Sequence, residues 1–360
     1  MIDPLLLVFD PQFWSQCRPF SPLIQLLNLE RMGLCLVGPL SELMRAIRYS
    51  AHGDPDVLEV ETIDQPTPAE SEVLVAVHAT SINGLDIARR SGRLPESAFP
   101  KVPGVDVAGV IEAAGDSVTE FDVGDRVFGV GYGNGGTYAD FIALPVENLA
   151  PLPADASFVN GAAVAHVGMT AWRAIIDHGN LGLADTCLIH GGAGGVGHLA
   201  VQLGSETGAE VIATAGAEET LERVPEFGAD TVLDFRRSDL ADAIEETADS
   251  GVDVILDSHL GHYLELDVEV AAPEGRIVTI AGSDPNFENT SVARSKELTI
   301  QPMAVFNTPN YSDVLRRLGR LLETDRLVPE IAETYGLEEA VAAQQAFEEV
   351  RLGKIMLTAQ

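Results

Sequence analysis

Three glycines in the stretch HGGAGGVG have the spacing of a phosphate-binding turn. Gly192, Gly194 and Gly197 form the pattern G-x-G-x-x-G, with Gly195 and Val196 inside it. One glycine permits the tight bend, one lets backbone approach a pyrophosphate, and the last lets the next helix pack closely on the strand. The helix N-terminus then offers unpaired N–H groups to the phosphates. Without a strand before it and a helix after it, the same spacing is an ordinary glycine-rich turn.

The segments around this turn decide between the two interpretations. TCLIH before the turn has the apolar pattern of a strand, and VGHLAVQLGSETG after it has that of a helix. EVIATAG then supplies a second strand. This order is the βαβ setting that a dinucleotide-binding turn requires. The sequence therefore predicts a cradle for the pyrophosphate of a dinucleotide.

The end of the second strand bears on which dinucleotide is bound. NAD sites usually place an acidic residue there to hold the ribose hydroxyls. This strand ends in Thr214, Ala215 and Gly216, without an acid. Its absence favours NADP and leaves NAD open. Arg236 is one of the few basic residues nearby and is our candidate for the phosphate of NADP. The alternative for Arg236 is a solvated surface charge.

The wider pattern predicts two kinds of architecture along the chain. Residues 44–152 contain short apolar stretches separated by Gly and Asp, which are typical of a compact β-barrel domain. A helix pattern over 161–179 ends at Gly179. After it, strand and helix patterns alternate up to residue 282, which predicts a parallel sheet covered by helices on both faces.

The last fifty residues continue with less regular elements. Helix patterns occupy residues 311–324 and 337–353. A final apolar run over 354–359 has the composition of a strand.

The composition is strongly acidic and poor in lysine. The net charge is −33, with 55 acidic against 22 basic residues, and only Lys101, Lys296 and Lys354 are lysines. The acids are dispersed through patterned sequence, which fits a folded protein of a halophile's salt-rich cytoplasm, where screening weakens self-repulsion. The same charge argues against nucleic acid and anionic membranes as partners.

Cysteine usage and hydropathy exclude other classes of protein. Cys17, Cys35 and Cys187 lie far apart and form no Cys-x-x-Cys pair, so we expect neither a disulfide framework nor a structural zinc cluster. The longest apolar runs are too short to cross a bilayer. Residues 1–43 are less acidic than the rest and rich in Leu, Phe and Pro. We expect a poorly ordered extension there, or an upstream start codon with the true start at Met44.

Several spaced motifs together resemble a known family. They are INGLDIARRSG, PGVDVAGVIEAAG, VGDRVFG, GGTYADF, VGMTAWRAI, HGGAGGVGHLAVQL, GVDVILD and LGKIML, in this order between residues 44 and 360. They resemble the zinc-independent quinone oxidoreductase (zeta-crystallin-like) branch of the medium-chain dehydrogenase/reductase superfamily. Several motifs in the right order are more specific than the glycine turn alone.

The resemblance implies an α/β fold with two domains and a cleft between them. Residues 44–156 are expected to form a GroES-like β-barrel catalytic domain, with 304–360 folding back onto it. Residues 157–303 are expected to form a Rossmann domain with a doubly wound parallel sheet. Residues 1–43 lie outside the resemblance.

The resemblance also implies where the cofactor lies on the Rossmann side. Backbone at the strand ends commonly borders its ribose and nicotinamide. Here those strand ends carry Asp257 and Ser258, followed by Ala281 and Gly282. Lys354 occupies the family's Gly-Lys position near the C-terminus, and its alternative is a solvated charge.

The positions of the metal ligands in zinc-dependent relatives carry other residues here. Those relatives supply a Cys, a His-Glu pair and a second Cys or His. This chain has Asn83 at the first position, Val105-Asp106 at the second and His166 at the third. Catalytic zinc needs three protein ligands, so we expect no metal.

The resemblance then implies catalytic roles without zinc. Asn83 is expected to hydrogen-bond a substrate carbonyl or the nicotinamide ribose, unless it serves only the turn chemistry of its Asn-Gly pair. His166 is expected to donate a hydrogen bond to a substrate oxygen or to shuttle a proton. Its alternative is a buried structural histidine. Tyr138 is expected to line the cleft, unless it belongs to the core. Ala88 stands where many relatives carry a tyrosine.

The sequence thus predicts an NADPH-dependent, zinc-independent oxidoreductase that reduces quinones or α,β-unsaturated carbonyls (enones) by hydride transfer. The cofactor supplies the hydride, and the protein supplies orientation and polarisation. We also predict a homo-oligomer, either a dimer or a tetramer. A zinc-free dehydrogenase of alcohols, sugars or acyl thioesters, and a non-catalytic NAD(P)-binding sensor, remain alternatives.

Overall fold

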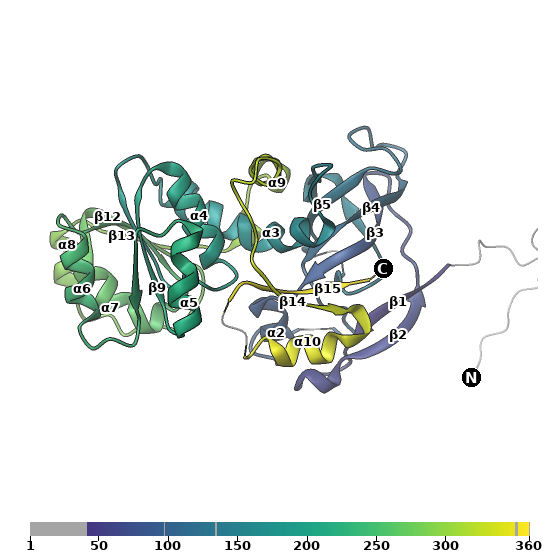
Figure 1. Ribbon diagram of the computed structural model, residues 1–360. Helices are drawn as coiled ribbons and strands as arrows, with labels where there is room; N and C mark the ends of the chain where they lie inside the picture. The colour runs from purple at the N-terminus through teal and green to yellow at the C-terminus, as the bar shows by residue number, and fades with distance from the viewer. Residues whose placement is uncertain (1–41, 97, 134, 350–351, 360) are drawn as a thin grey trace, which may run out of the picture. The chain divides into compact units, whose positions relative to one another are not determined.

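Two large β-sheets are joined by one long helix (Figure 1). The computed structural model describes residues 42–96, 98–133, 135–349 and 352–359. The predictions for residues 1–43 therefore concern residues outside the described ranges, apart from Glu42 and Leu43. Within Glu42–Gln360 the described chain forms a single unit.

The first large sheet has seven strands in the order β14-β15-β3-β4-β5-β7, with β6 paired to β3. Its strands from the first half of the chain are β3 (Glu72–Ser81), β4 (Asp106–Ala114), β5 (Arg126–Val130), β6 (Phe141–Pro145) and β7 (Leu149–Pro151). β3 is central because its apolar run is buried on both faces. The strands β1 (Leu43–Arg48) and β2 (Glu59–Asp64) form a separate antiparallel pair, and the short helix α2 (Gly84–Arg90) follows β3.

The second large sheet is entirely parallel and has six strands in the order β10-β9-β8-β11-β12-β13. Its strands are β8 (Thr186–Ile189), β9 (Glu210–Ala215), β10 (Thr231–Asp234), β11 (Val252–Asp257), β12 (Ala271–Thr279) and β13 (Thr299–Pro302). This is the Rossmann strand order, in which the direction of winding reverses between β8 and β11. Ligands of such sheets bind at the carboxyl ends of the strands at that point.

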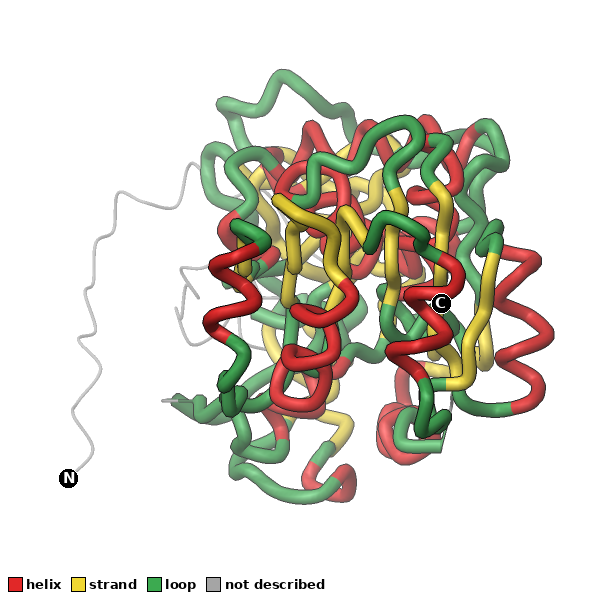
Figure 2. The backbone as a smooth tube through the Cα atoms, turned by 90° about the vertical axis from the view of Figure 1, so that its left-hand side faces the viewer, coloured by secondary structure: helices red, strands yellow, loops and turns green. Residues whose placement is uncertain are grey.

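Helices cover both faces of this parallel sheet. They are α4 (Gly197–Thr207), α5 (Glu218–Arg223), α6 (Leu240–Thr247), α7 (Leu260–Val270) and α8 (Thr290–Ser295). The helices α4 and α5 lie on one side of the strands and α6 and α7 on the other (Figure 1), and Figure 2 shows helices in red around the strands in yellow. The predicted α/β class, with a GroES-like sheet and a doubly wound parallel sheet, is confirmed.

The helix α3 (Phe158–Ala171) connects the two sheets. The hydroxyl of Ser157 caps its start by accepting a hydrogen bond from the N–H of Asn160. The helix continues as a π-helical segment over Trp172–His178 and ends at Gly179, as the pattern predicted. Its alanine-rich surface is buried almost all round, because α3 packs against β3, β4 and β5 and also against α4.

The C-terminal segment returns to the first sheet. The helix α9 (Tyr311–Glu323) packs on α3 and β7, and β14 (Ile331–Gly336) lies parallel to β15 (Lys354–Thr358). Strand β15 pairs antiparallel with β3, with Met356 opposite Ser81. The last strand of the chain therefore becomes part of the sheet that carries Asn83 at its end.

The predicted helix over 337–353 is much shorter than its pattern. The helix α10 covers only Ala340–Ala346. After it, the N–H groups of Glu348 and Glu349 bond to carbonyls three residues back, which tightens the chain into turns. Gly353 then takes a left-handed conformation, with φ +70°, just before β15 begins. The chain must leave the helix here because β15 has to reach the edge of β3.

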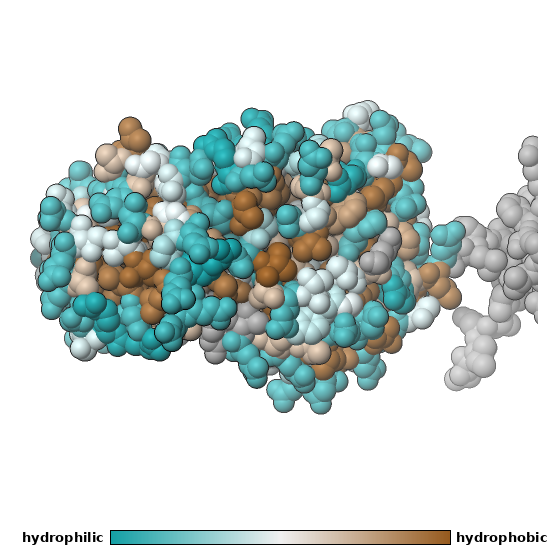
Figure 3. All heavy atoms as spheres, in the orientation of Figure 1, coloured by the Kyte–Doolittle hydropathy of each residue, from teal (hydrophilic) through white to brown (hydrophobic). Residues whose placement is uncertain are grey.

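The surface is largely hydrophilic, in agreement with the strongly acidic composition. Hydrophilic side chains cover most of the face shown in Figure 3, and hydrophobic ones gather in patches near its middle. No helix in the described part of the chain is long and apolar enough to cross a membrane.

The contact between α4 and the glycine turn leaves no room for a side chain at Gly197. A Cβ there would lie 2.0 Å from the carbonyl oxygen of Gly191. We predict that Gly197→Ala lowers the free energy of unfolding by about 2 kcal/mol, since overpacked sites force backbone shifts. Urea denaturation measures it.

The neighbouring glycine provides the control. A Cβ at Gly194 would have the Gly191 oxygen at 3.4 Å as its nearest contact. Gly194→Ala should therefore cost less than half as much as Gly197→Ala. Equal losses would show that the close approach of α4 is not what requires Gly197.

Candidate active site

The glycine turn is fixed by two hydrogen bonds that it donates to Thr214 of the next strand, β9. Strand β8 ends just before His190, and α4 begins at Gly197. The N–H of Gly191 donates to Thr214 Oγ1 at 3.1 Å, and the N–H of Gly192 donates to the Thr214 carbonyl at 2.8 Å. The backbone between Gly192 and Gly197 is thereby fixed at the end of β8, where a pyrophosphate would bind.

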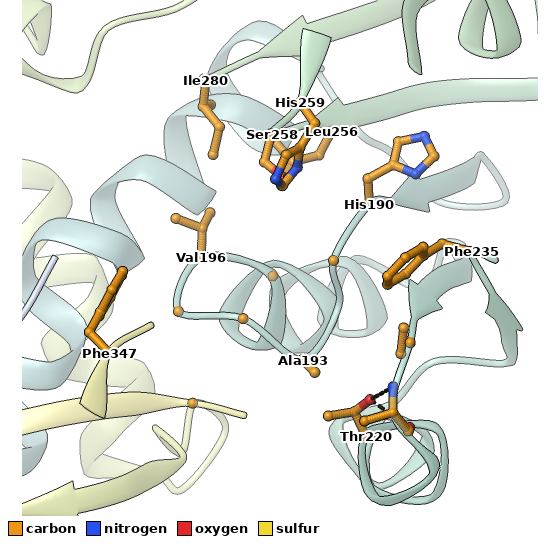
Figure 4. A pocket seen from close by; sticks show the side chains of 18 of the residues that line it. His190, Ala193, Val196, Thr220, Phe235, Leu256, Ser258, His259, Ile280 and Phe347 are labelled. Atoms are coloured by element: carbon orange, nitrogen blue, oxygen red, sulfur yellow. Dashed lines mark hydrogen bonds between the residues drawn. The ribbon is translucent and has the colours of Figure 1, made fainter. Parts of the chain in front are cut away.

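A pocket of about 880 Å³ opens along this turn (Figure 4). Besides the glycine turn, its wall includes residues from the part of the chain that carries the first sheet. They are Ile87, Arg93, Phe347, Gly353 and Ile355. In Figure 4, Val196 and Ile280 point toward one another at one end, and Phe235 and Thr220 lie at the other. The pocket sits where the winding of the parallel sheet reverses, as expected of a dinucleotide site.

Eight of the predicted cofactor-binding residues line this pocket. They are Gly194, Gly195, Val196, Gly197, Ala215, Gly216, Arg236 and Ser258. Backbone and small side chains thus form much of the wall, and a Cβ at Gly197 or Gly216 would overlap neighbouring protein atoms. Such a wall lets backbone approach a dinucleotide closely.

Four other predicted residues lie outside the lining: Thr214 and Asp257 are buried, whereas Ala281 and Gly282 are exposed. Thr214 is buried beneath the turn. Asp257 is also buried, and its Oδ1 accepts the N–H of His259 at 2.6 Å. Ala281 accepts the N–H of Leu260 at 3.3 Å, and Gly282 has φ +124°, so both shape the chain after β12. Burial raises the pKa of Asp257 to about 6.

Phe235 is a pocket residue that sequence reasoning missed. A Cβ at Gly216 would lie 2.2 Å from its ring, so the ring covers that glycine. Phe235 directly follows Asp234, which pairs in register with Ala215 of the neighbouring parallel strand. The motif TVLDF carried this information, because the residue after a parallel strand lies at the same edge as the cofactor turn.

Arg236 has a carboxylate partner that the sequence analysis did not anticipate. Its Nη2 lies 2.6 Å from Asp234 Oδ2, and its Nε lies 2.8 Å from Asp234 Oδ1. The guanidinium holds the pKa of Asp234 at about 2. The pair stands at the exposed rim of the pocket, one strand away from the acid-free end of β9.

A polar cluster of Ser81, Asn83, Asp106, His166 and Lys354 lies buried beside the glycine turn. Asp106 is its centre, with no exposed surface. Its Oδ2 accepts from Ser81 Oγ at 2.5 Å and from Asn83 Nδ2 at 2.6 Å, and its Oδ1 accepts the His166 N–H at 2.6 Å. The carboxylate therefore holds together β3, the start of α2 and the middle of α3.

Asp106 is the main residue of the site that the sequence analysis did not select. It was noted only as the position where zinc-dependent relatives carry a ligand. A buried carboxylate is rarely left without partners. An acid inside the apolar run PGVDVAGVI was the indication that the sequence offered.

Lys354 joins this polar cluster to the cofactor turn. Its Nζ donates to Asn83 Oδ1 at 2.6 Å and to the Ile82 carbonyl at 3.0 Å, and lies 3.9 Å from Asp106 Oδ2. The adjacent Gly353 N–H donates to the carbonyl of Ala193 in the turn at 2.8 Å. Burial lowers the pKa of Lys354, and the nearby carboxylates oppose that shift. Lys354 is a buried charge with partners, so the solvated alternative does not describe it.

His166 is partly buried at the edge of the polar cluster. Its Nδ1 lies 2.5 Å from the hydroxyl of Tyr132, which follows β5. Burial lowers the pKa of His166 to about 4, so the imidazole is neutral near pH 7. The next residue, Val167, would lie 3.7 Å from a Cβ at Gly195, which puts this stretch of α3 against the cofactor turn.

Asn83 begins α2 and is buried within the polar cluster. Its backbone N–H donates to Asp86 Oδ2 at 2.9 Å, which closes a capping box. Its side-chain amide makes three hydrogen bonds, since Nδ2 donates to Asp106 and to Ser81 Oγ, and Oδ1 accepts from Lys354. Burial raises the pKa of Asp86 to about 6.

Tyr138 lies in the core of the first sheet and outside the pocket wall. It has no exposed surface, and its hydroxyl lies 3.3 Å from the Ser81 carbonyl and 3.4 Å from Asp86 Oδ2. This placement matches the core alternative. Through Ser81 and Asp86, Tyr138 supports the polar cluster from behind.

The residues of this site do not form a metal-binding set. Across the ranges that the structure describes, no three His, Cys, Asp or Glu side chains are arranged to hold a metal ion. Asp106 is already engaged by donors on both oxygens, and His166 Nδ1 is engaged by Tyr132. Catalytic zinc takes three protein ligands, which this arrangement does not provide.

The ammonium of Lys354 compensates a buried carboxylate, so removing it should be costly. We predict that Lys354→Met lowers the free energy of unfolding by about 3 kcal/mol, since breaking a buried pair leaves the partner charge uncompensated. Lys296→Met is the matched control, because Lys296 Nζ donates only to backbone carbonyls in the described chain. It should cost less than half as much. Equal losses in urea denaturation would contradict the role of the Asp106 pairing.

The lowered pKa of His198 leads to a prediction of how the free energy of unfolding changes with pH. It is fully buried in α4, its Nδ1 lies 2.9 Å from the Gly194 carbonyl, and burial lowers its pKa to about 4. As pH falls below about 6.5, the unfolded chain binds a proton that the folded chain does not, so stability is lost. This loss is about 2 kcal/mol at pH 5.

We therefore predict that His198→Asn, which keeps a donor toward Gly194, reduces the loss of stability between pH 7 and pH 5 by about 2 kcal/mol. Denaturation curves at both pH values measure this difference. Between pH 8 and pH 7 the variant and the parent chain should change in parallel, which serves as the control. An unchanged loss between pH 7 and pH 5 would show that His198 does not titrate in this way.

Comparison with known proteins agrees with this geometry. Residues 69–154 match the alcohol dehydrogenase GroES-like domain family, and residues 195–320 match the zinc-binding dehydrogenase family. A quinone oxidoreductase of Mus musculus is 33% identical over 311 residues, covering 84% of this chain and 94% of that protein.

Two solved structures are also similar. A quinone oxidoreductase of Pseudomonas syringae has a TM-score of 0.80 and 29% identity, covering 88% of this chain and 100% of the other. The Escherichia coli quinone oxidoreductase complexed with NADPH has a TM-score of 0.80 and 26% identity, with the same coverage. The chain is thus an NAD(P)H-dependent oxidoreductase that belongs to the quinone oxidoreductase (zeta-crystallin-like) branch of the medium-chain dehydrogenase/reductase superfamily.

Proposed function

We propose that this protein uses NADPH to reduce quinones or α,β-unsaturated carbonyls without zinc. The observation that carries the proposal is the neutral His166 beside the cofactor turn. Its Nε2 has no hydrogen-bond partner among the described residues. When bound, the reduced cofactor supplies a hydride to the acceptor. The chain supplies the donor that meets the negative charge developing on the acceptor's oxygen.

The polar cluster orients the groups around that oxygen. Asp106 and Lys354 hold the Asn83 amide from both sides, and Asp106 also fixes the backbone of His166. In this proposal, Asn83 contacts the substrate carbonyl or the nicotinamide ribose, and His166 donates to the reduced oxygen. Tyr138 supports them from the core.

Conjugated acceptors suit this set of donors. A quinone or an enone delocalises the charge that follows hydride addition, so less stabilisation of the oxygen is needed. Exchange between simple alcohols and ketones would gain more from a metal acting as Lewis acid. The lack of a three-ligand set in the described chain supports the zinc-free proposal.

NADPH is the proposed cofactor because the end of β9 lacks the acid that NAD sites carry there, and the rim of the pocket carries a base. Strand β9 ends without a carboxylate, and Arg236 stands at the rim. The Escherichia coli relative was solved with NADPH. Because Arg236 is paired with Asp234, the 2′-phosphate of NADPH would have to share Arg236 with that carboxylate or displace the carboxylate from it.

The test is a panel of acceptors in molar KCl, which suits the acidic composition. Oxidation of NADPH and of NADH should be followed with quinones, enones, aldehydes, acyl thioesters and sugars, with metal content measured in parallel. We expect turnover with quinones or enones, preference for NADPH, no stoichiometric zinc, and a homo-oligomeric mass. His166→Ala should lower kcat about 100-fold, since a general acid contributes on that order.

Four outcomes would overturn parts of this proposal. Turnover only with alcohols, sugars or acyl thioesters would indicate a zinc-free dehydrogenase. Cofactor binding without turnover of any acceptor would indicate a sensor. One zinc per chain, or full activity in His166→Ala, would remove the proposed roles of the donors.

A further inference from the structure

Tyr132 contacts the one imidazole that the proposed function relies on. It follows β5, whereas His166 lies in α3, so the two meet only in the folded chain. The Tyr132 hydroxyl lies 2.5 Å from His166 Nδ1. Both residues are partly exposed.

The number of donors and acceptors on Tyr132 and His166 indicates which of the two groups donates. Neutral histidine carries one proton, on either Nδ1 or Nε2. If Nδ1 carried it, the Tyr132 proton would need another acceptor, and no other partner of that hydroxyl is found among the described residues. If the Tyr132 hydroxyl donates to Nδ1, the hydroxyl proton and the Nδ1 lone pair each have a partner. The proton of His166 then resides on Nε2, the nitrogen that remains free to meet a substrate.

Packing holds the phenol in this position. The Tyr132 ring meets Phe306 edge-on at 5.7 Å between centroids and Tyr311 at 5.4 Å. Such edge contacts favour a defined orientation of the ring. The hydroxyl of Tyr311 donates to the Phe306 carbonyl at 2.7 Å, so its bond is made to backbone and not to His166.

We propose that Tyr132 is the positioning residue that sets the tautomer of His166, so that Nε2–H faces the acceptor and can be resupplied with a proton. This inference rests on the proposed function. After hydride adds to the acceptor's carbon, the Nε2–H bond breaks and an O–H bond forms on the acceptor's oxygen. The Tyr132 proton moves to Nδ1, and solvent returns a proton to Tyr132. The ring of His166 is then neutral again with its proton on Nδ1, and exchange through Tyr132 and solvent restores the starting tautomer.

The tautomer is measured directly, without any substrate. In the full chain with ¹⁵N-labelled histidine, the His166 signals are identified by their loss in His166→Ala. We expect Nε2 to show the shift of a protonated nitrogen and Nδ1 that of a bare one. In Tyr132→Phe, which removes only the hydroxyl, both shifts should move toward intermediate values. In Tyr311→Phe, the matched control, they should stay unchanged. A protonated Nδ1 in the parent chain, or unchanged shifts in Tyr132→Phe, would overturn the proposal.

A double-mutant cycle then tests whether Tyr132 acts through His166. On an acceptor that the parent chain reduces, Tyr132→Phe should lower kcat about 10-fold and leave the KM for NADPH unchanged, since orientation accounts for part of a general acid's effect. Tyr311→Phe should stay within about twofold of the parent chain, because its hydroxyl does not reach the acid.

In the His166→Ala background, adding Tyr132→Phe should have no further effect, because the two residues act as a unit. Equal effects in both backgrounds would show that Tyr132 acts independently, which overturns the proposal. A parent chain that reduces no acceptor would instead sink the proposed function, and the nitrogen shifts would still decide the tautomer.

Discussion

The carboxylate of Asp106 lies buried where four segments of the chain meet, and its need for partners organises the site. A charge without water is tolerated only when donors surround it. Here the donors come from β3, from the start of α2, from the backbone of α3 and, at longer range, from Lys354 at the start of β15. Satisfying one carboxylate therefore fixes the amide of Asn83 and the backbone of His166 on its two oxygens.

The glycine turn is also linked to the polar cluster, through Gly353 and Lys354. Gly353 donates to Ala193 in the turn, while Lys354 reaches Asn83 and Asp106. Two adjacent residues thus connect the parallel sheet to the barrel-like sheet. A substitution in the glycine turn or in the polar cluster is therefore expected to affect the other, because packed interiors transmit strain.

Much of the fold was predictable because its elements have regular patterns. The alternation after residue 157 and the glycine turn indicated the parallel sheet, which the structure confirms. The helix over 337–353 was predicted too long, because its end depends on the pairing of β15 with β3, a contact far away in sequence. Phe235 and Asp106 were not selected for the site, since register between strands and a shared buried carboxylate are properties of the folded chain. The roles assigned to Asn83 and His166 remain predictions.

The position of β15 also has a consequence for how the enzyme is made. The strand that supplies Lys354 pairs with β3, whose residues are synthesised some 270 positions earlier. Until residues 353 and 354 have left the ribosome, Asp106 has no ammonium partner and the glycine turn has no anchor from Gly353. The parallel sheet can form earlier in synthesis, but the complete site can assemble only once these two residues have emerged. Incomplete chains should therefore lack the pairing that the site needs to bind its cofactor productively.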